Sequence, residues 1–252
     1  MKKMKQLIAF VCMLLCAANL AAQEREMIPV DWQHIRQEVN DNPQHVKDLV
    51  ARLSAATLDT TLTKRERILA FYGQSFLTND AEETLVMEMN KQARSGEHAN
   101  RLATAKSILS INPLNLDALI SAGIVLTEMA KDSTVQASGA PVEDAKPYFR
   151  KAMRIFNTIA ATGDGSEAHP FYVTKVSDEY NFMRYYLELW EYDTQSATAC
   201  CDVFTLSKLS EYYIKPTIYF EITRVYELER MMFQSNATKI IKEKLTGQNL
   251  NL

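Results

Sequence analysis

Apolar residues recur at a helical period through the first two-thirds of the chain. After the helix-breaking pair Asn42-Pro43, one amphipathic helix is predicted by the i, i+3, i+4, i+7 spacing of Val46, Leu49, Val50 and Leu53. The clearest pattern of this kind runs from Ala145 to Ile159 and precedes Gly163, a residue typical of helix C-caps. The pattern therefore predicts several helices that each bury one face.

Capping and breaking residues place further helices between these two. Thr63, followed three residues later by Glu66, has the signature of a capping box at the start of a helix. Asn79 or Asp80 is suited to begin the next helix, and Asn112-Pro113 is expected to end the one after it. Helices are expected at 99–111 and 116–131, and a loop at 132–141.

Two of the predicted helices carry a glycine at the same place in an apolar pattern. Leu69, Gly73 and Phe76 have the spacing of the first helix of a tetratricopeptide unit, where glycine lets the partner helix approach closely. Gly123 has similar surroundings, but it lies 50 residues after Gly73 rather than 34. We expect a degenerate, TPR-like array of helical hairpins; a generic α-bundle with small residues at helix crossings is the alternative.

Beyond Gly163 the pattern changes to short β-branched and aromatic runs. Strands are predicted at 171–176, 198–206 and 217–223, because apolar and polar residues alternate or β-formers cluster there. Ser177 is expected to cap a short helix that buries Phe182, Tyr185 and Leu189 on one face. The predicted fold class is α+β, mainly α: a TPR-like hairpin array followed by a small antiparallel sheet.

The N-terminus has the pattern of an export signal. Three lysines, Lys2, Lys3 and Lys5, precede the apolar run Leu7 to Leu15, which is about half of the roughly 20 residues that span a bilayer. Cleavage is expected after Ala22, although a buried core helix or a lipid anchor on Cys16 are alternatives. We therefore expect a periplasmic or secreted protein with no integral membrane segment after signal removal.

These patterns divide the chain into four parts. The expected parts are a signal peptide at 1–22, a helical TPR-like region at 23–163, a small α+β region packed on the helices at 164–235, and a polar tail at 236–252.

Charge and cysteine content limit the possible functions. The chain has 28 basic and 31 acidic residues, and loss of three lysines with the signal would leave 25 against 31. This mild acidity argues against non-specific nucleic-acid binding, which needs a basic face. Only the adjacent Cys200 and Cys201 would remain of the four cysteines, so no disulfide framework is expected.

Several local sequences together resemble one protein family. They are Asp59-Thr60-Thr61-Leu62-Thr63, Phe71-Tyr72-Gly73, Asn112-Pro113-Leu114-Asn115, Gly163-Asp164-Gly165, Val176-Ser177-Asp178-Glu179-Tyr180, Asp202-Val203-Phe204 and Ile218-Tyr219-Phe220. In this order they resemble a family of exported proteins with a domain of unknown function, typical of Bacteroides-type bacteria. The resemblance implies an envelope or extracellular location and brings no assigned reaction and no catalytic residues.

The sequence predicts no catalytic residue, metal site or cofactor. None of the histidines, which are His34, His45, His98 and His169, has a metal-ligand spacing to another candidate ligand. Phosphate-binding loops and nucleophile elbows are absent from the sequence. Cys200 and Cys201 are either two ordinary strand positions or a reactive pair, whose redox state the sequence leaves open. Whether the protein is an enzyme is uncertain, and the balance favours a non-catalytic protein.

Candidate binding residues come from the last third of the chain, which is rich in aromatic residues. Asp178 and Glu179 begin a predicted helix, where carboxylates also simply stabilise the helix dipole. Tyr186 and Trp190 lie one step around from the expected buried face and are the better candidates for a ligand-binding surface, although packing is the commoner role of aromatics.

Two triplets are candidates for O-glycosylation, on the pattern by which bacteria of this kind modify exported proteins. They are Asp59-Thr60-Thr61 and Asp132-Ser133-Thr134, with Thr60 and Ser133 as the modified residues.

Two functions are compatible with these features. The first is a non-catalytic protein- or peptide-binding scaffold of the envelope, since stacked hairpins form concave surfaces. The alternative is a hydrolase or binding protein for glycans or peptidoglycan, built on Asp178, Glu179 and the nearby aromatics. A deep pocket that unites two carboxylates with raised pKa would favour the alternative, and a flat open surface would oppose it.

Overall fold

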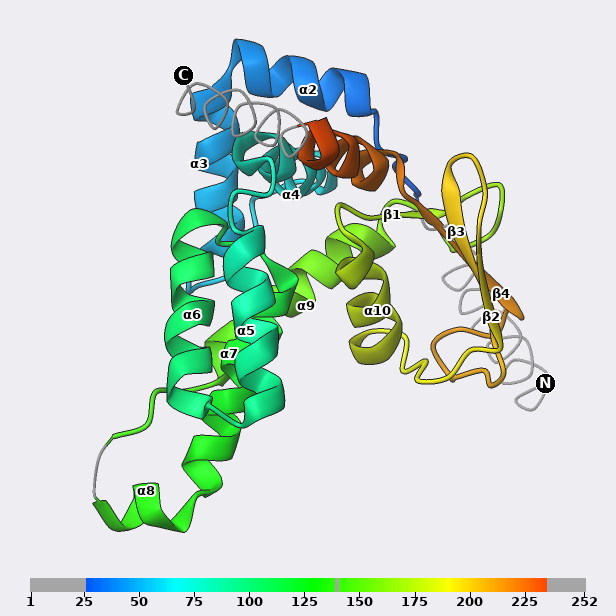
Figure 1. Ribbon diagram of the computed structural model, residues 1–252. Helices are drawn as coiled ribbons and strands as arrows, with labels where there is room; N and C mark the ends of the chain where they lie inside the picture. Colours follow the sequence, from blue (N-terminus) through cyan, green and yellow to red (C-terminus); the bar gives the residue numbers. More distant parts are fainter. Residues whose placement is uncertain (1–25, 139–140, 235–252) are drawn as a thin grey trace, which may run out of the picture.

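The structure is a computed structural model that describes residues 26–138 and 141–234 (Figure 1). The predicted signal peptide at 1–22 and the polar tail at 236–252 lie outside the described residues. Among the described residues, no helix has both the length and the apolar character needed to cross a membrane.

The first part of the described chain consists of helices that pack on their neighbours in sequence (Figure 1). Their bounds are α2 (Trp32–Asp41), α3 (Pro43–Ser54), α4 (Lys64–Thr78), α5 (Glu83–Ser95), α6 (His98–Ile111), α7 (Leu116–Lys131), α8 (Ser133–Ser138) and α9 (Lys146–Ala160). The long helix α9 packs on α7 and also reaches back to α3 and α4. The fold class predicted from the sequence, α+β and mainly α, is confirmed.

Local capping explains where several of these helices begin. The Thr63 hydroxyl accepts a hydrogen bond from Glu66 N, while the Glu66 carboxylate accepts one from Thr63 N, so the predicted capping box of α4 is confirmed. The Asn115 side chain caps α7 by accepting from Ala118 N at 2.9 Å. Asn112 ends α6, as its position before a proline suggests.

Two predictions need correction, and one helix was not predicted. Helix α5 begins at Glu83 rather than at 79 or 80, because Asn79 and Asp80 adopt left-handed backbone conformations that end α4. Helix α8 occupies most of the loop predicted at 132–141. Helix α2 was not predicted at all; Asp31 caps it by accepting from His34 N.

Both glycines of the TPR-like pattern lie at helix crossings. A Cβ on Gly73 would come within 2.7 Å of Val46 in α3, and a Cβ on Gly123 within 2.7 Å of the Phe149 ring in α9. Gly73 therefore faces helices that precede it, whereas Gly123 faces one that follows. The close approaches exist, but the tetratricopeptide-like repeat itself stays a prediction.

A small sheet follows the helices. Its strands are β1 (Phe171–Tyr172), β2 (Thr194–Ala197), β3 (Cys201–Thr205) and β4 (Thr217–Glu221), in the order β1-β4-β3-β2. Strands β2, β3 and β4 pair antiparallel, but β1 pairs parallel to β4, so the sheet is mixed rather than purely antiparallel as predicted. Strand β2 was not predicted.

The strand predicted at 171–176 is cut short by a side chain. The Asp178 carboxylate accepts hydrogen bonds from Thr174 N at 3.2 Å, Thr174 Oγ1 at 2.8 Å and Lys175 N at 3.1 Å. These bonds turn the chain away from β4 and into helix α10 (Val176–Tyr185), which therefore begins one residue before the predicted cap Ser177. Phe182 and Leu189 are buried as predicted, but Tyr185, the last residue of the helix, is 40% exposed and lies edge-on to the exposed Trp190.

One hydrophobic cluster joins the helices to the sheet. The predicted buried face of β4 is confirmed, because Ile218, Phe220 and Ile222 are all at most 2% exposed. The rings of Phe182 in α10 and Phe204 in β3 pack edge-on against Phe220. Residues 223–234 then form a further helix beside α2 and α4 (Figure 1). This helix was not predicted from the sequence.

Candidate functional site

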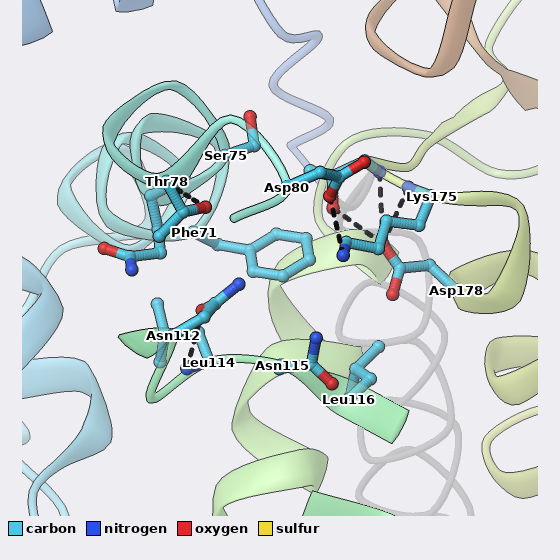
Figure 2. Close-up of a pocket in the computed structure, with 12 residues that line it drawn as sticks. Phe71, Ser75, Thr78, Asp80, Asn112, Leu114, Asn115, Leu116, Lys175 and Asp178 are labelled. Atoms are coloured by element: carbon cyan, nitrogen blue, oxygen red, sulfur yellow. Dashed lines mark hydrogen bonds and ion pairs between the residues drawn. The ribbon is translucent and has the colours of Figure 1, made fainter. Parts of the chain in front are cut away.

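A buried polar centre lies where the α4–α5 loop meets the start of α10 (Figure 2). The ammonium of Lys175 lies 2.6 Å from Asp80 Oδ1, 3.3 Å from Glu82 Oε1 and 3.6 Å from Glu83 Oε2. The Glu82 side chain is fully buried and also accepts a hydrogen bond from Asn112 Nδ2 at 2.7 Å. This cluster, named here the Lys175 centre, links three helices through charge.

The loop that supplies the acidic residues is held from the other side by an arginine. Arg224 is 1% exposed and donates to Ser75 O and to Asn79 Oδ1, each at 2.7 Å. Its guanidinium also lies 3.9 Å from the centre of the Phe76 ring. Two cations, Arg224 and Lys175, thus fix the left-handed turn at Asn79 and Asp80.

Pairing keeps Glu82 and Lys175 ionised in the Lys175 centre. Burial alone would raise the pKa of Glu82, but Lys175 and Asn112 outweigh it and the pKa lies below its ordinary value. Burial also opposes the charge of Lys175, yet Asp80 and Glu82 raise the pKa of Lys175 above its ordinary value. The cavity beside these groups measures about 10 Å³, which is room for about one water molecule. The cavity at the Lys175 centre is therefore too small for a ligand larger than water.

Asp178 and Glu179, the two candidate carboxylates, are both buried in the first turn of α10. Burial, together with the charge of Asp117, raises the pKa of Asp178 to about 6. Both carboxylate oxygens of Glu179 lack a hydrogen-bond partner among the described residues, and burial followed by the charge of Asp202 raises the pKa of Glu179 to about 9. Glu179 is therefore protonated at neutral pH.

An open groove lies between the helices and the loops that flank the sheet. Its volume is about 1380 Å³. Helix α9, the 163–171 loop, the end of α10 and the 212–215 loop all contribute to it, through Met153, Phe171, Tyr185, Tyr186, Tyr212 and Ile214 among others. This surface is named here the tyrosine groove.

The aromatic side chains of the tyrosine groove differ in their exposure to solvent. Tyr213 is 6% exposed, and its hydroxyl donates to a backbone oxygen of Gly165 or Thr217, which lie 2.9 and 2.8 Å away. Tyr212 and Ile214, on either side of it, are 61% and 76% exposed. The fixed residue Tyr213 thus lies between two residues, Tyr212 and Ile214, whose side chains face solvent. Exposed apolar patches of this kind are typical of binding surfaces.

The floor and rim of the tyrosine groove are built by the 163–170 loop. The backbone N–H groups of Asp164 and Gly165 both donate to His169 O at 3.0 Å. A Cβ on Gly163 would lie 2.2 Å from Pro170 O, so only glycine fits there. At the rim, Asp164 Oδ2 pairs with Lys215 Nζ at 2.7 Å, and although burial opposes it, Lys215 lowers the pKa of Asp164 to about 2.

The structure separates the four candidate binding residues. Tyr186 lines the tyrosine groove, where its ring stacks on Phe182 and its hydroxyl donates to Asn157 Oδ1 at 3.0 Å. Trp190 is 63% exposed and lies edge-on to the groove residue Tyr185. Asp178 and Glu179 lie in the interior and do not line the groove.

The candidate modification sites are both on the surface. Thr60 is exposed beside Asp59, whose carboxylate pairs with Arg52 and holds Thr61. Ser133 is exposed at the first position of α8.

Several residues of the tyrosine groove were not predicted from the sequence. Ile214 and Met153 were not selected, because one lies in a loop and the other on a helix whose apolar face was expected to be buried. The run Tyr212-Tyr213-Ile214, apolar but outside any predicted strand, was the available signal. Over residues 26–138 and 141–234, no group of three or more His, Cys, Asp or Glu side chains is placed to hold a metal ion.

Comparison with known proteins identifies one family. The model of a domain of unknown function (DUF4919) matches residues 33–231, which include all elements from the second residue of α2 to the last helix. The chain belongs to this family. No curated protein and no solved structure matches the chain.

Proposed function

We propose that this member of the DUF4919 family is an exported, non-catalytic binding module that holds an apolar segment of a partner protein in the tyrosine groove. The single observation that carries the proposal is the exposure of Tyr212 and Ile214 at the edge of a groove of about 1380 Å³. Pockets for small ligands are usually about 300–1000 Å³ and enclosed, so a larger open groove suits an elongated ligand.

The chemistry of the groove favours a peptide segment. Four tyrosines, two methionines and one isoleucine are among its lining residues, and aromatic residues and methionine are enriched where proteins bind one another. At its rim Asp164 and Lys215 neutralise each other, and the remaining charged lining residues, Glu26 and Glu188, are acidic. An anionic ligand would therefore be disfavoured there.

The two carboxylates named for a glycan hydrolase lie outside the groove. Such an enzyme would need two carboxylates near its ligand, and Asp178 and Glu179 do not line the tyrosine groove. Of the carboxylates that do line it, Glu26, Asp164 and Glu188, Asp164 is held by Lys215. The alternative that remains is a glycan-binding protein, because exposed aromatics such as Trp190 and Tyr212 also stack on sugars.

Selection from a displayed library of random peptides tests the proposal. The full chain is compared with the double variant Tyr212→Ala/Ile214→Ala and with Met87→Ala, a control on α5 whose side chain is similarly exposed at 58%. Enriched peptides should bind the wild type and Met87→Ala equally and the double variant at least tenfold more weakly. Equal binding to all three proteins would reject the groove, and enrichment on a glycan array alone would favour the alternative.

Export and surface modification are part of the same proposal. They rest on the N-terminal pattern at residues 1–22 and on the exposed positions Thr60 and Ser133. The intact mass of the protein from its native host measures both at once. We expect the mass of a polypeptide that begins at Gln23 plus added mass, which peptide mapping then places on Thr60 or Ser133. A mass that includes residues 1–22 would reject export, and the absence of added mass would reject modification.

A further inference from the structure

Two cysteine side chains meet at the tip of the β2–β3 hairpin, away from the tyrosine groove. Cys200 lies in the turn and is exposed, whereas Cys201 is the first residue of β3 and is buried. Their sulfur atoms are 3.4 Å apart. Neither residue lines the groove, so this pair has no part in the function proposed above.

The backbone around the two cysteines is tightly held. Thr198 N donates to Cys201 O at 2.8 Å, and Cys201 N donates to Thr198 Oγ1 at 3.0 Å. On the neighbouring strand, Ile222 N donates to Cys200 O at 2.9 Å. These hydrogen bonds hold the exposed Cys200 and the buried Cys201 in fixed positions at the turn.

We propose that Cys200 and Cys201 form a surface dithiol that reduces disulfide bonds by thiol–disulfide exchange. Its substrates would be small disulfide compounds or disulfide bonds of partner proteins. In the first step the Cys200 thiol gives its proton to solvent, and its sulfur attacks one sulfur of the disulfide. A mixed disulfide forms on Cys200 and one thiolate leaves and takes up a proton. In the second step the Cys201 sulfur, after losing its proton, attacks Cys200 Sγ and releases the other half as a thiol.

The step balances without any further reactant. The partner disulfide gains two electrons and two protons and becomes two thiols, while Cys200 and Cys201 become joined by a disulfide bond. Attack depends on a thiolate that can be reached. Burial, followed by the neighbouring Cys200, raises the pKa of the Cys201 thiol to about 12, so the exposed Cys200 attacks first and Cys201 resolves.

Adjacent positions make the product reversible. Consecutive Cα atoms are about 3.8 Å apart, which is shorter than the roughly 4.4–6.8 Å of ordinary disulfides. A disulfide between neighbours is therefore strained, and strained disulfides are the more easily reduced ones. This property suits a site that exchanges rather than one that staples the fold.

Intact mass and peptide mapping of the purified full chain after incubation with oxidised glutathione test the proposal. We expect the peptide that contains residues 200 and 201 to lose the mass of two hydrogen atoms and to recover it under reduced glutathione. The variant Cys201→Ala should stop at a glutathione adduct on Cys200, and Cys200→Ser should show neither product.

Two results would overturn the inference. One is a stable glutathione adduct on Cys200 in the wild-type protein, because the second sulfur would then fail to resolve it. The other is a peptide that keeps both thiols after incubation. Both readouts come from the wild-type chain, so they hold even where a variant folds poorly.

Discussion

The Lys175 centre and the tyrosine groove differ in chemistry and in access. The first is a buried cluster of charged residues, and the second is an open surface with aromatic residues. The centre gathers Lys175, Asp80, Glu82 and Glu83 around about 10 Å³ of space, and the groove places Tyr212 and Ile214 at the edge of about 1380 Å³. Charged groups dominate the closed site and apolar groups the open one. The buried ion pairs of the Lys175 centre therefore mark a structural joint, and the exposed aromatics mark the candidate binding surface.

The difference follows from the cost of burying charge. A buried ion needs oppositely charged and hydrogen-bonding groups around it, and Lys175 and Asn112 supply them to Glu82 Oε1. These side chains fill most of the space, and the cavity beside them measures about 10 Å³. Around the tyrosine groove, by contrast, backbone hydrogen bonds fix Tyr213 and the 163–170 loop, so side chains beside them remain free to face solvent.

The largest effect is expected from breaking the Lys175 centre. Lys175→Met removes the cation from three carboxylates, one of which, Glu82, is fully buried. Loss of one partner of a buried pair costs about 3–5 kcal/mol, and urea unfolding measures this loss. Lys106→Met, which breaks the exposed pair with Glu143, is the control and should change stability by less than about 1 kcal/mol. Similar losses in both variants would contradict a structural role for the centre.

A smaller effect is expected at the floor of the groove. In Gly163→Ala the new methyl group meets the backbone oxygen of Pro170, which cannot move aside, so we expect a loss of about 3 kcal/mol in urea unfolding. In Gly123→Ala it meets the Phe149 side chain, which is 41% exposed and free to rotate, so the loss should be about 1 kcal/mol. The reverse order would show that the 163–170 loop is not a rigid floor.

The unpaired carboxyl of Glu179 contrasts with the paired ones and predicts a pH dependence. Its pKa in the folded protein is about 9, above the ordinary value of 4.5, so the folded state keeps a proton that the unfolded state loses. Stability from this group is full below about pH 4.5 and falls as the pH rises towards 9.

Glu179→Gln should remove that slope, because glutamine stays neutral. Unfolding free energies at pH 5, 7 and 9 measure it, and the variant should lose less stability than the wild type over this range. Asp178, whose pKa is about 6, is unchanged in both proteins and contributes equally to each. Parallel pH profiles would mean that Glu179 is already ionised in the folded protein.

The smallest effect is expected from the exposed groove residues. Tyr212→Ala/Ile214→Ala removes side chains that are 61% and 76% exposed, so the free energy of unfolding should change by less than about 0.5 kcal/mol. Thermal and urea midpoints measure this. A loss of unfolding free energy as large as that of Gly163→Ala would mean that these side chains stabilise the loop and are not free to bind a ligand.

Periodic patterns were sufficient for most of the fold. Helix α7 has the predicted bounds, and Ile218, Phe220 and Ile222 face the core as their alternation suggested. Strand β2 was missed because Thr194 to Ala197 are all exposed, so no buried face imposes an alternating pattern on them. The end of β1 was missed because it depends on bonds from the Asp178 side chain rather than on strand propensity.

The candidate site was less accessible to sequence reasoning. Asp178 and Glu179 look like solvated charges at a helix start, and their burial comes from the sheet and helices that pack over them. The tyrosine groove joins α9 to a loop some 60 residues later, and no local spacing relates Met153 to Tyr212. Tyr186, chosen as a binding candidate because it lay off the expected buried face, lines the tyrosine groove, and its role in binding stays a prediction.

Chemical-shift mapping of the labelled protein with a selected peptide tests most directly which of the two regions binds. The account predicts that the backbone amide signals of Tyr185, Tyr212 and Ile214 move as peptide is added, while those of Lys175, Asp178 and Glu179 stay in place. Movement centred on the Lys175 centre, with the tyrosine groove unchanged, would contradict it.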